Sequence, residues 1–324
     1  MGNRPIDVGL IITTVEDRER DWILSWNEIK QLVTTGEAVG FDSVWIPDHL
    51  IHEPEGVDPY GIWEAWSLIS ALAAVTDRVR IGPHVLCTGW RNPALIAKMA
   101  DTVDEISNGR LILALGAGWH QPEYRAFGFP FDHRIGRFAE ALGIIVPLLR
   151  SGEVTFEGEF YQAIACELRP RGPRPEGPPI MIGTIAGTPL GGWLRIERGG
   201  NRVLDLVARY ADIWNCPIVN DPALIPGIRE MIDVACVNNN RHPATLKRTN
   251  GVAFNLPGWE KTTGNPNTRA RRLAMGATEG DPGELADLLN RFAEEGVSEV
   301  HVQLDPETPA GIEQFAKTLE ILDR

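Results

Sequence analysis

An acidic residue and a histidine stand next to each other at Asp48 and His49, directly after the apolar, β-rich run from Ser43 to Ile46. Histidine titrates near neutral pH and is suited to proton transfer, and a carboxylate can orient its ring. We therefore expect both side chains to face a bound ligand. In this interpretation His49 relays a proton, and Asp48 either orients His49 or hydrogen-bonds the ligand.

Two other interpretations of this segment stay open. His49 could be a neutral structural imidazole whose hydrogen bonds are satisfied within the fold. Alternatively, Asp48, His49 and His52 could bind zinc or iron, since carboxylate and imidazole ligands suit these metals. The metal interpretation is disfavoured, because adjacent strand residues point to opposite sides and no histidine ends the fifth or sixth predicted strand. We predict no metal site.

The segment Gly116-Ala117-Gly118 could approach a ligand through its backbone, because small residues allow a flat ring to come close. It lacks the third glycine of a dinucleotide fingerprint, and Trp119 follows it as a wall for a pocket. Four tryptophans in predicted loops indicate a pocket for a flat molecule, although they could also simply plug the mouth of the fold. They are Trp90, Trp119, Trp193 and Trp259.

A candidate anion site consists of Gly199, Gly200 and Arg202, with Arg198 beside them, at the start of a predicted helix. The free N–H groups of a helix N-terminus carry a partial positive charge, and an arginine adds a full one. The alternative is a flexible loop with solvated arginines.

Apolar periodicity and turn residues divide the chain into alternating strands and helices. The predicted strands span Ile6–Ile12, Ser43–Ile46, Val79–Leu86, Leu111–Leu115, Pro179–Gly183, Ala211–Trp214, Arg248–Phe254 and Ser298–Leu304. The predicted helices span Asp21–Val39, Ile62–Val75, Pro93–Ser107, Arg134–Leu149, Arg202–Arg209, Pro222–Asn238, Asp281–Glu295 and Pro309–Leu322. Eight βα units in this order predict a (β/α)8 TIM barrel, whose active site lies at the carboxyl ends of the strands.

Two stretches interrupt this alternation and are predicted to be insertions outside the barrel. Residues 151–178 contain an alternating pattern typical of a hairpin, and residues 256–280 are polar and basic. We therefore expect a single α/β domain over residues 1–324. An open doubly wound sheet is the alternative, but it would normally have a glycine fingerprint after its first strand.

The charge and hydropathy of the chain exclude several classes of partner. Its 31 Lys and Arg against 44 Asp and Glu give a net charge of −13, which disfavours nucleic acid and anionic membranes. No apolar run approaches the roughly 18 residues of a membrane helix, and no signal-peptide pattern is visible. The four cysteines include no C-x-x-C pair. We expect a soluble, cytoplasmic protein with reduced thiols and a small-molecule substrate.

Several segments, taken together and in order, resemble the bacterial luciferase-like monooxygenase superfamily, and within it the branch that uses the deazaflavin coenzyme F420. The resemblance extends from about Ile6 to Leu322. The matching segments are Gly40–His49, Asn92–Lys98, Ser107–Arg110, Gly116–Trp119 and Arg209–Asn215.

The resemblance implies a barrel that binds a reduced flavin or deazaflavin with its ring at the strand ends. In this family a non-prolyl cis peptide supports the middle of the ring, and it maps to His84 and Val85. The remaining matches are Asp48 and His49 to the polar pair beside the ring, Ala117 and Gly118 to the ring-lining loop, and Gly199, Gly200 and Arg202 to the phosphate site.

The sequence departs from the family pattern at two places. Trp119 stands where sugar-phosphate dehydrogenases of the family carry a glutamate, which disfavours that substrate class and leaves the general acid unassigned. Residues 184–198 look inserted before the phosphate glycines. The resemblance also implies a homodimer formed through the second and third helices.

We expect an oxidoreductase that transfers a hydride between coenzyme F420 and a small organic substrate. An alternative keeps the fold and changes the chemistry: a monooxygenase that takes reduced FMN from a separate reductase. A third candidate, from another class, is a non-catalytic barrel that only binds a flavin. The substrate itself is not predicted, because the variable loops determine it.

Overall fold

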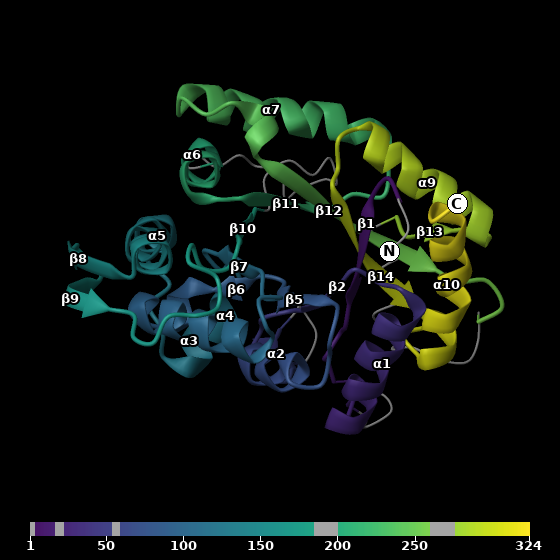
Figure 1. Ribbon diagram of the computed structural model, residues 1–324, viewed down its shortest axis with the longest axis horizontal. Coiled ribbons are helices and arrows are strands. Elements are labelled where there is room, and N and C mark those ends of the chain that lie inside the picture. The colour runs from purple at the N-terminus through teal and green to yellow at the C-terminus, as the bar shows by residue number, and fades with distance from the viewer. Residues whose placement is uncertain (1–3, 17–22, 54–58, 185–199, 260–275) are drawn as a thin grey trace.

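Residues 4–16, 23–53, 59–184, 200–259 and 276–324 are described by the computed structural model. Within them, parallel strands form a barrel in the order β5-β2-β1-β14-β12-β11-β10-β7-β6, with helices on the outside (Figure 1). The strands are β1 (Asp7–Ile11), β2 (Ser43–Ile46), β5 (Arg80–Pro83), β6 (Leu86–Cys87), β7 (Leu113–Gly116), β10 (Ile180–Gly183), β11 (Ile213–Ile218), β12 (Lys247–Asn255) and β14 (Glu299–Asp305). All eight predicted strands are present, and the predicted TIM barrel is confirmed.

The third predicted strand is divided in two. Its first part, β5, pairs with β2, and its second part, β6, pairs with β7, so the two parts together occupy one position in the barrel. A single bridge between Ile81 and Leu111 joins the first part to the residues before β7. His84 and Val85 lie at the break, and the peptide bond between them is cis, as the resemblance implies. The sequence predicts one continuous strand here because apolar residues stand on both sides of Gly82-Pro83-His84.

The predicted helices are present, with small differences at their ends. They are α1 (Trp26–Val39), α2 (Ala65–Ala73), α3 (Pro93–Ile106), α5 (Arg134–Ser151), α6 (Gly200–Tyr210), α7 (Ile225–Asn238), α9 (Pro282–Glu294) and α10 (Pro309–Leu322). Asn92 and Asp281 cap α3 and α9 as their sequence positions predict. The second helix begins later than predicted, because Ile62 bridges Val15 and Glu64 forms the cap.

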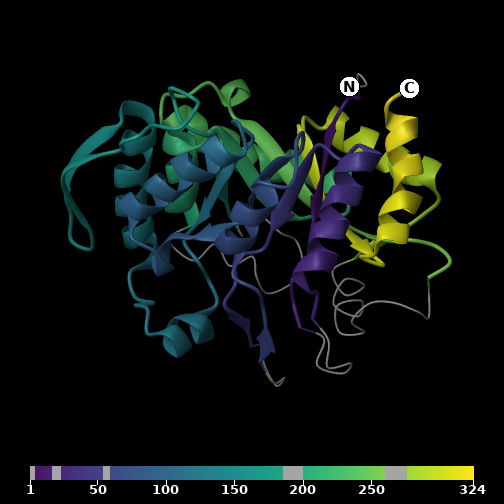
Figure 2. The same ribbon diagram turned by 60° about the horizontal axis from the view of Figure 1, so that its bottom comes forward.

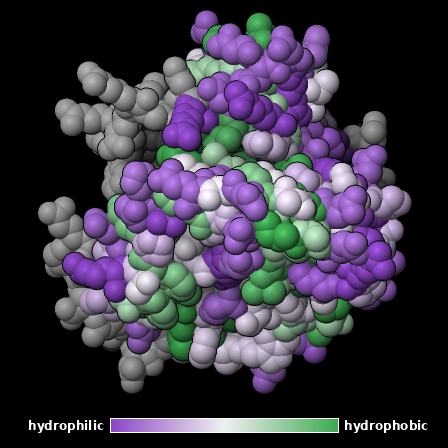
Figure 3. All heavy atoms as spheres, turned by 90° about the vertical axis from the view of Figure 1, so that its left-hand side faces the viewer, coloured by the Kyte–Doolittle hydropathy of each residue, from purple (hydrophilic) through white to green (hydrophobic). Residues whose placement is uncertain are grey.

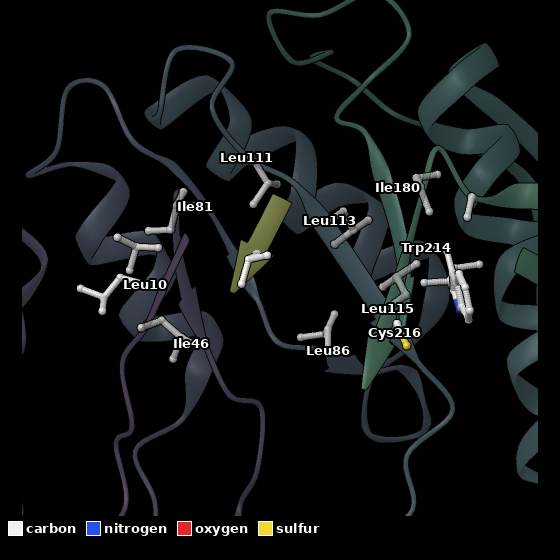
Figure 4. Close-up of a cluster of buried hydrophobic side chains, with 14 of the residues drawn as sticks. Leu10, Ile46, Ile81, Leu86, Leu111, Leu113, Leu115, Ile180, Trp214 and Cys216 are labelled. Atoms are coloured by element: carbon white, nitrogen blue, oxygen red, sulfur yellow. The ribbon is translucent and has the colours of Figure 1, made fainter. Parts of the chain in front are cut away.

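Two separate cores hold the barrel together. Apolar side chains on the outer faces of the strands pack under the helices (Figure 4), as expected for a parallel sheet covered by helices. A smaller cluster that includes Ile11, Trp45 and Met181 joins residues of β1, β2 and β10. Because these residues alternate with the outer set along their strands, they fill the interior of the barrel.

The first insertion forms a hairpin of β8 (Glu153–Glu157) and β9 (Gln162–Glu167), which is a separate sheet beside α5 (Figures 1 and 2). This confirms the hairpin expected within residues 151–178. Two parts of the predicted insertions lie outside the described residues. They are residues 260–275 of the second insertion and residues 185–198 of the segment that looks inserted before the phosphate glycines. The end of the second insertion joins the barrel sheet, because β13 (Thr278–Glu279) pairs with β12. The expectation that this insertion lies outside the barrel is therefore wrong for these residues.

The face that carries the hairpin and α5 is largely hydrophilic, with small apolar patches between the polar side chains (Figure 3). In the part of the chain that the structure describes, no helix is long and apolar enough to cross a membrane.

Gly82 allows the Trp45 indole to lie inside the barrel. A Cβ atom at Gly82 would overlap the carbonyl oxygen of Ile112 and lie 2.8 Å from Cζ3 of Trp45. We expect Gly82→Ala to lower the free energy of unfolding by about 1 to 3 kcal/mol, the usual cost of overpacking. Gly227→Ala is the control, since nothing lies within 4 Å of a Cβ there and alanine favours the helix by up to about 1 kcal/mol. Urea denaturation measures both, and a Gly82→Ala protein as stable as the parent would contradict this packing.

Candidate functional site

Polar and aromatic side chains gather around the carboxyl ends of β2, β6 and β7. The short β3 (Ile51–His52) and β4 (Tyr60–Gly61) pair with each other, and the helix α4 (Gln121–Phe127) contacts β3. Figure 2 shows this ribbon and α4 at the same end of the barrel. The loops after β2 and β7, which carry half of the predicted site residues, therefore meet.

Asp48 is buried, and its carboxylate is fully engaged. It accepts hydrogen bonds from both terminal nitrogens of Arg91, at 2.8 and 2.9 Å, and from the backbone N–H of Cys87 at 2.8 Å. These contacts tie the end of β2 to the segment that follows the divided third strand. Asp48 is therefore placed at the rim as predicted, but its hydrogen bonds go to Arg91 and Cys87.

Arg91 neutralises this buried carboxylate and extends the contact to α2. One of its nitrogens also lies 2.6 Å from Glu64 Oε1, the residue that caps α2. Burial raises the pKa of the Asp48 carboxyl, and the charge of Arg91 opposes that shift. Burial likewise opposes the charge on Arg91, but Asp48 and Glu64 raise the pKa of its guanidinium above the ordinary value. The two acids and the arginine form one rigid unit.

His49 contacts a different carboxylate, that of Glu123 in α4. The distance from His49 Nδ1 to Glu123 Oε1 is 2.7 Å, and the other oxygen of Glu123 accepts the N–H of Leu50 at 2.7 Å. The Glu123 side chain is inaccessible to solvent, whereas that of His49 is 23% exposed. A carboxylate that faces inward thus holds an imidazole that remains accessible to a ligand.

Aromatic rings surround His49. The Trp119 indole meets it edge-on, with ring centroids 5.9 Å apart, and His52 lies 5.8 Å away in a similar orientation. His52 also stacks on His120 at 5.1 Å. His120 in turn accepts the N–H of Glu53 through Nε2 at 2.9 Å. The predicted wall residue Trp119 therefore lies beside the predicted proton relay.

The backbone of Ala117 and Gly118 is held from two sides. Tyr124 donates its hydroxyl to the Ala117 carbonyl at 3.1 Å, and Arg134 Nη1 donates to the Gly118 carbonyl at 2.6 Å. Gly118 has a φ of 71°, and a Cβ there would overlap the Tyr124 hydroxyl and lie 2.6 Å from the sulfur of Cys87. Only glycine fits this position. Burial raises the pKa of the Cys87 thiol to about 12, so it is not a nucleophile.

His84 belongs to a buried pair of imidazoles inside the barrel. Its Nε2 lies 3.1 Å from Nδ1 of His301, which also receives the amide N–H of Asn215 at 3.4 Å. Burial lowers the pKa of His84 to about 4 and that of His301 well below its ordinary value. Both rings are therefore neutral near pH 7. Because the amide of Asn215 donates to His301 Nδ1, His84 is the donor between the two rings.

The buried polar chain continues from His301 toward the other end of the barrel. His301 Nε2 lies 3.6 Å from Glu299, which accepts the hydroxyl of Ser43. Ser43 in turn accepts the indole N–H of Trp45 at 2.7 Å. Burial raises the pKa of the Glu299 carboxyl, and Arg80, 3.4 Å away, opposes that shift. The barrel interior is thus partly polar beneath the candidate site.

Buried polar atoms without a hydrogen-bond partner also occur at the carboxyl ends of three neighbouring strands. Among the described residues, these atoms are the hydroxyls of Thr13 and Thr14 after β1, one oxygen of Asn255 in β12 and one of Asp305 in β14. Buried polar groups are normally paired. These atoms are therefore polar groups at one rim whose hydrogen bonds are not supplied by the described residues.

Other predicted residues lie in different surroundings. Gly199 is outside the described residues, Gly200 is the first residue of α6, and Arg202 is exposed in the first turn of that helix. Of the loop tryptophans, Trp193 is outside the described residues. Trp90 packs on the Tyr124 ring, and Trp259 donates its indole N–H to the side-chain oxygen of Gln314 in α10. Of the three loop tryptophans that the structure describes, Trp119 is the one with a ring contact to His49.

Sequence reasoning missed Glu123, Arg91, His120 and His301 as parts of the site. The one signal for Glu123 was its place in the loop after the fourth predicted strand, because α4 has only seven residues and no clear period. Arg91 follows the third strand and could have been matched to Asp48 by its charge. His301 lies within a predicted strand, where an imidazole would ordinarily be structural.

No group of three or more histidine, cysteine or acidic side chains suited to a metal ion occurs within the described ranges. The imidazoles near His49 contact one another through ring faces and edges. In the described residues, the four cysteines form no disulfide.

The chain belongs to the luciferase-like monooxygenase family, whose model matches residues 6–191. The predicted family is therefore confirmed, and it is a family of enzymes. Four of the five matching sequence segments lie inside this range, including the one that ends at His49.

Relatives of two kinds are similar to this chain. An F420-dependent glucose-6-phosphate dehydrogenase of Amycolatopsis mediterranei is 36% identical over 171 residues, which is 50% of this chain and 48% of the relative. The pyrimidine monooxygenase RutA of Rhizobium rhizogenes is 34% identical over 185 residues, 55% of this chain and 46% of the relative. The chain spans about half the length of these curated relatives.

Solved structures extend the likeness of the fold to nearly the whole chain. An F420-dependent secondary alcohol dehydrogenase, solved with an F420-acetone adduct, matches with a TM-score of 0.77 over 98% of this chain and 99% of its own, at 18% identity. The monooxygenase RslO1 from Streptomyces bottropensis matches with a TM-score of 0.75 over 98% and 99%, also at 18% identity. At this identity the likeness concerns the fold alone.

Because burial keeps His84 neutral in the folded protein, this residue should make the free energy of unfolding depend on pH. Its folded pKa of about 4 lies below the ordinary 6.5, so between these values the unfolded chain binds more protons and the free energy of unfolding falls as pH falls. The variant His84→Gln removes this titrating group and keeps a hydrogen-bond donor for His301. Its free energy of unfolding should therefore fall less between pH 7 and pH 5 than that of the parent, by up to about 2 kcal/mol. Urea denaturation at pH 5, 6 and 7 measures this. The exposed His242 supplies the control His242→Gln, and equal slopes for parent and His84→Gln would contradict the account.

Proposed function

We propose that the chain transfers a hydride between coenzyme F420 and a small organic substrate. The observation that carries this proposal is the Glu123–His49 contact beside Trp119, at the carboxyl ends of the strands. A cofactor with a reactive face needs a wall on one side, close backbone on the other, and a proton donor or acceptor nearby. The candidate site supplies one group for each need.

Glycines let protein side chains pack directly against the backbone of the proposed ring site. A Cβ at Gly116 or at Gly183 would come within 3.0 Å of the Val85 side chain, and Gly118 likewise admits none. The ring would lie against the backbone of Ala117 and Gly118 and the bond between His84 and Val85, with Trp119 beside it. Gly199, Gly200 and Arg202 would hold the phosphate. The deazaflavin itself would supply the hydride-carrying carbon.

His49 is the proposed proton relay, and Glu123 positions it. A carboxylate only accepts hydrogen bonds, so Nδ1 of His49 carries a hydrogen and Nε2 is the atom left to exchange a proton with a ligand. Asp48, proposed as a catalytic or cofactor-binding residue, acts in this account by fixing the segment that carries His49. The contact that orients the His49 ring comes from Glu123.

Variants of this pair test the assignment. We expect His49→Gln to lower kcat by about 100-fold, the usual effect of removing an acid or base. Glu123→Gln should lower it less, by about 10-fold, because the ring keeps its relay atom and loses only its orientation. His52→Gln is the matched control, because His52 is an imidazole in the same cluster to which the proposed mechanism gives no proton-transfer role. If His49→Gln kept its cofactor affinity and a turnover within threefold, the role would be abandoned.

A second candidate function is a monooxygenase that uses reduced FMN from a separate reductase. The similarity to pyrimidine monooxygenase RutA favours it, and a flavin ring has the same flat shape as a deazaflavin ring. A deazaflavin has carbon in place of the flavin nitrogen that supports reaction with oxygen. Oxygen uptake on mixing reduced cofactor and substrate would therefore favour the monooxygenase.

Fluorescence titration with F420 and with FMN, each oxidised and reduced, tests the proposed cofactor. We expect micromolar or tighter binding of F420 and at least tenfold weaker binding of FMN. Preference for reduced FMN would contradict the proposal and favour the monooxygenase. Binding without multiple turnovers of any substrate would favour the non-catalytic barrel.

The remaining expectations stay predictions. A homodimer through α2 and α3 agrees with the exposure of two apolar side chains on α3, Leu95 at 53% and Ile106 at 45%. A soluble, cytoplasmic protein with a small-molecule substrate agrees with the charge of the chain.

A further inference from the structure

Three polar side chains lie at one level inside the mouth of the barrel. Asn255 of β12 and Asp305 of β14 are direct partners in the register of these strands. In the pairing of β1 with β14, Leu10 lies opposite Val302. An equal step further along both strands leads to Thr13 and to Asp305, so Thr13 lies at the level of Asp305. We call Thr13, Asn255 and Asp305 the acceptor group.

The side chains of the acceptor group point into the barrel. Residues alternate between the two faces of a strand, and the neighbours Ile12, Phe254 and Leu304 belong to the core outside the strands. Gln303, the preceding inward residue of β14, is partly exposed. Solvent therefore reaches the inward face of β14 close to its carboxyl end, where active sites of such barrels lie.

Each member of the acceptor group has one oxygen that receives no hydrogen bond from the described residues. These atoms are Oγ1 of Thr13, Oδ1 of Asn255 and Oδ2 of Asp305. The amide nitrogen of Asn255 donates to Glu279 at 3.4 Å, so the amide oxygen is the atom left. The backbone N–H of Thr13 donates to Glu307 at 2.8 Å and ties the segment after β1 to the segment after β14. Asn255 and Asp305 are 2% and 4% exposed.

The chemistry of these oxygens selects a hydrogen-bond donor. A carboxylate and an amide oxygen accept hydrogen bonds and donate none. A buried carboxylate oxygen without a partner is costly, and the N–H or O–H of a ligand would satisfy it. A carboxylate or phosphate of a ligand would instead place a second negative charge against Asp305. The acceptor group therefore suits a neutral or cationic donor.

The acceptor group lies across the barrel mouth from the ring-lining loop after β7. In the order of the sheet, β10, β11 and β12 stand between β7 and β14 on one side, and the divided third strand, β2 and β1 stand between them on the other. Figure 1 shows β1, β12 and β14 together, away from β6 and β7. A molecule that spans the mouth would meet the ring-lining loop at one end and the acceptor group at the other.

We propose that the acceptor group is the part of the substrate site that determines specificity, and that the substrate is a small molecule with a hydroxyl or amine group at the end away from the reacting carbon. This inference rests on the proposed function and names a substrate class for it. Asp305 and Asn255 accept the hydrogens of that group, and Thr13 supplies the third oxygen. Sugar phosphates and carboxylic acids bind poorly, because their anions face Asp305.

Three probes with the same ring and different end groups test this proposal: cyclohexylamine, cyclohexanol and cyclohexanecarboxylate. Calorimetric titration at pH 7 measures the Kd of each probe, first for the chain alone and then for the chain saturated with F420. The amine is protonated at this pH. We expect it to bind about tenfold more tightly than the carboxylate, with the alcohol between them, because charge-assisted hydrogen bonds are the stronger ones.

Variants locate the preference in the acceptor group. Asp305→Asn keeps the shape of the side chain and removes its charge, so the preference for the amine over the carboxylate should fall by about tenfold. Thr13→Val removes a hydroxyl at nearly constant shape and should weaken binding of the alcohol by about threefold. Asp287→Asn is the matched control, because it makes the same change of net charge at an exposed position of α9. It should change each Kd by less than about twofold, since exposed charges are screened.

The outcomes separate this proposal from the proposed function. If F420 binds but the probes bind equally well, or none of them binds, the assignment of the acceptor group is wrong and the proposed cofactor stands. An Asp305→Asn variant with the amine preference of the parent would overturn the assignment as well. If the chain alone shows the expected order of probes and F420 does not bind, the acceptor group is supported and the proposed function is wrong.

Discussion

The buried carboxylate of Asp48 is the interaction on which the geometry of the rim depends. A charged group with no solvent exposure is tolerated only when it is paired and hydrogen-bonded, because its desolvation is costly. Arg91 and the N–H of Cys87 satisfy it, and Arg91 also reaches Glu64 at the start of α2. The pairing thus joins the end of β2, the divided third strand and one helix. His49 follows Asp48 directly, so this unit also determines where the His49 ring lies.

Two carboxylates near the rim have different tasks. Asp48 is held by a permanent cation and cannot exchange a proton without breaking a bidentate pair. Glu123 contacts an imidazole that is itself partly exposed, and so the His49–Glu123 pair can respond to a ligand. Beneath them, His84 and His301 are kept neutral by burial. The charges near the proposed ring are therefore confined to a few groups whose positions are fixed by the fold.

Much of the fold could be predicted from the sequence, because period and turn residues report locally on strands and helices. The eight strands and the helix caps at Asn92 and Asp281 follow from such local signals. The break at His84 does not, because residues on either side of it continue the same apolar pattern. Its position was available only through the family resemblance.

The site could be predicted only in part, for a physical reason. Asp48 and His49 are marked by their types and by their place after a strand. Their partners are not, because Glu123 is 74 positions from His49 and Arg91 is 43 from Asp48, and such contacts depend on how the loops close over the barrel. His301, the partner of His84 inside the barrel, was missed because no local pattern distinguishes a polar barrel interior from an apolar one.

A crystal structure of the chain with F420 bound would test the central claim most directly. The account predicts that the ring lies between Trp119 and the backbone of Ala117 and Gly118, with Nε2 of His49 facing it and Nδ1 still bonded to Glu123. A ring bound elsewhere, or an His49 side chain turned away from it, would contradict the account.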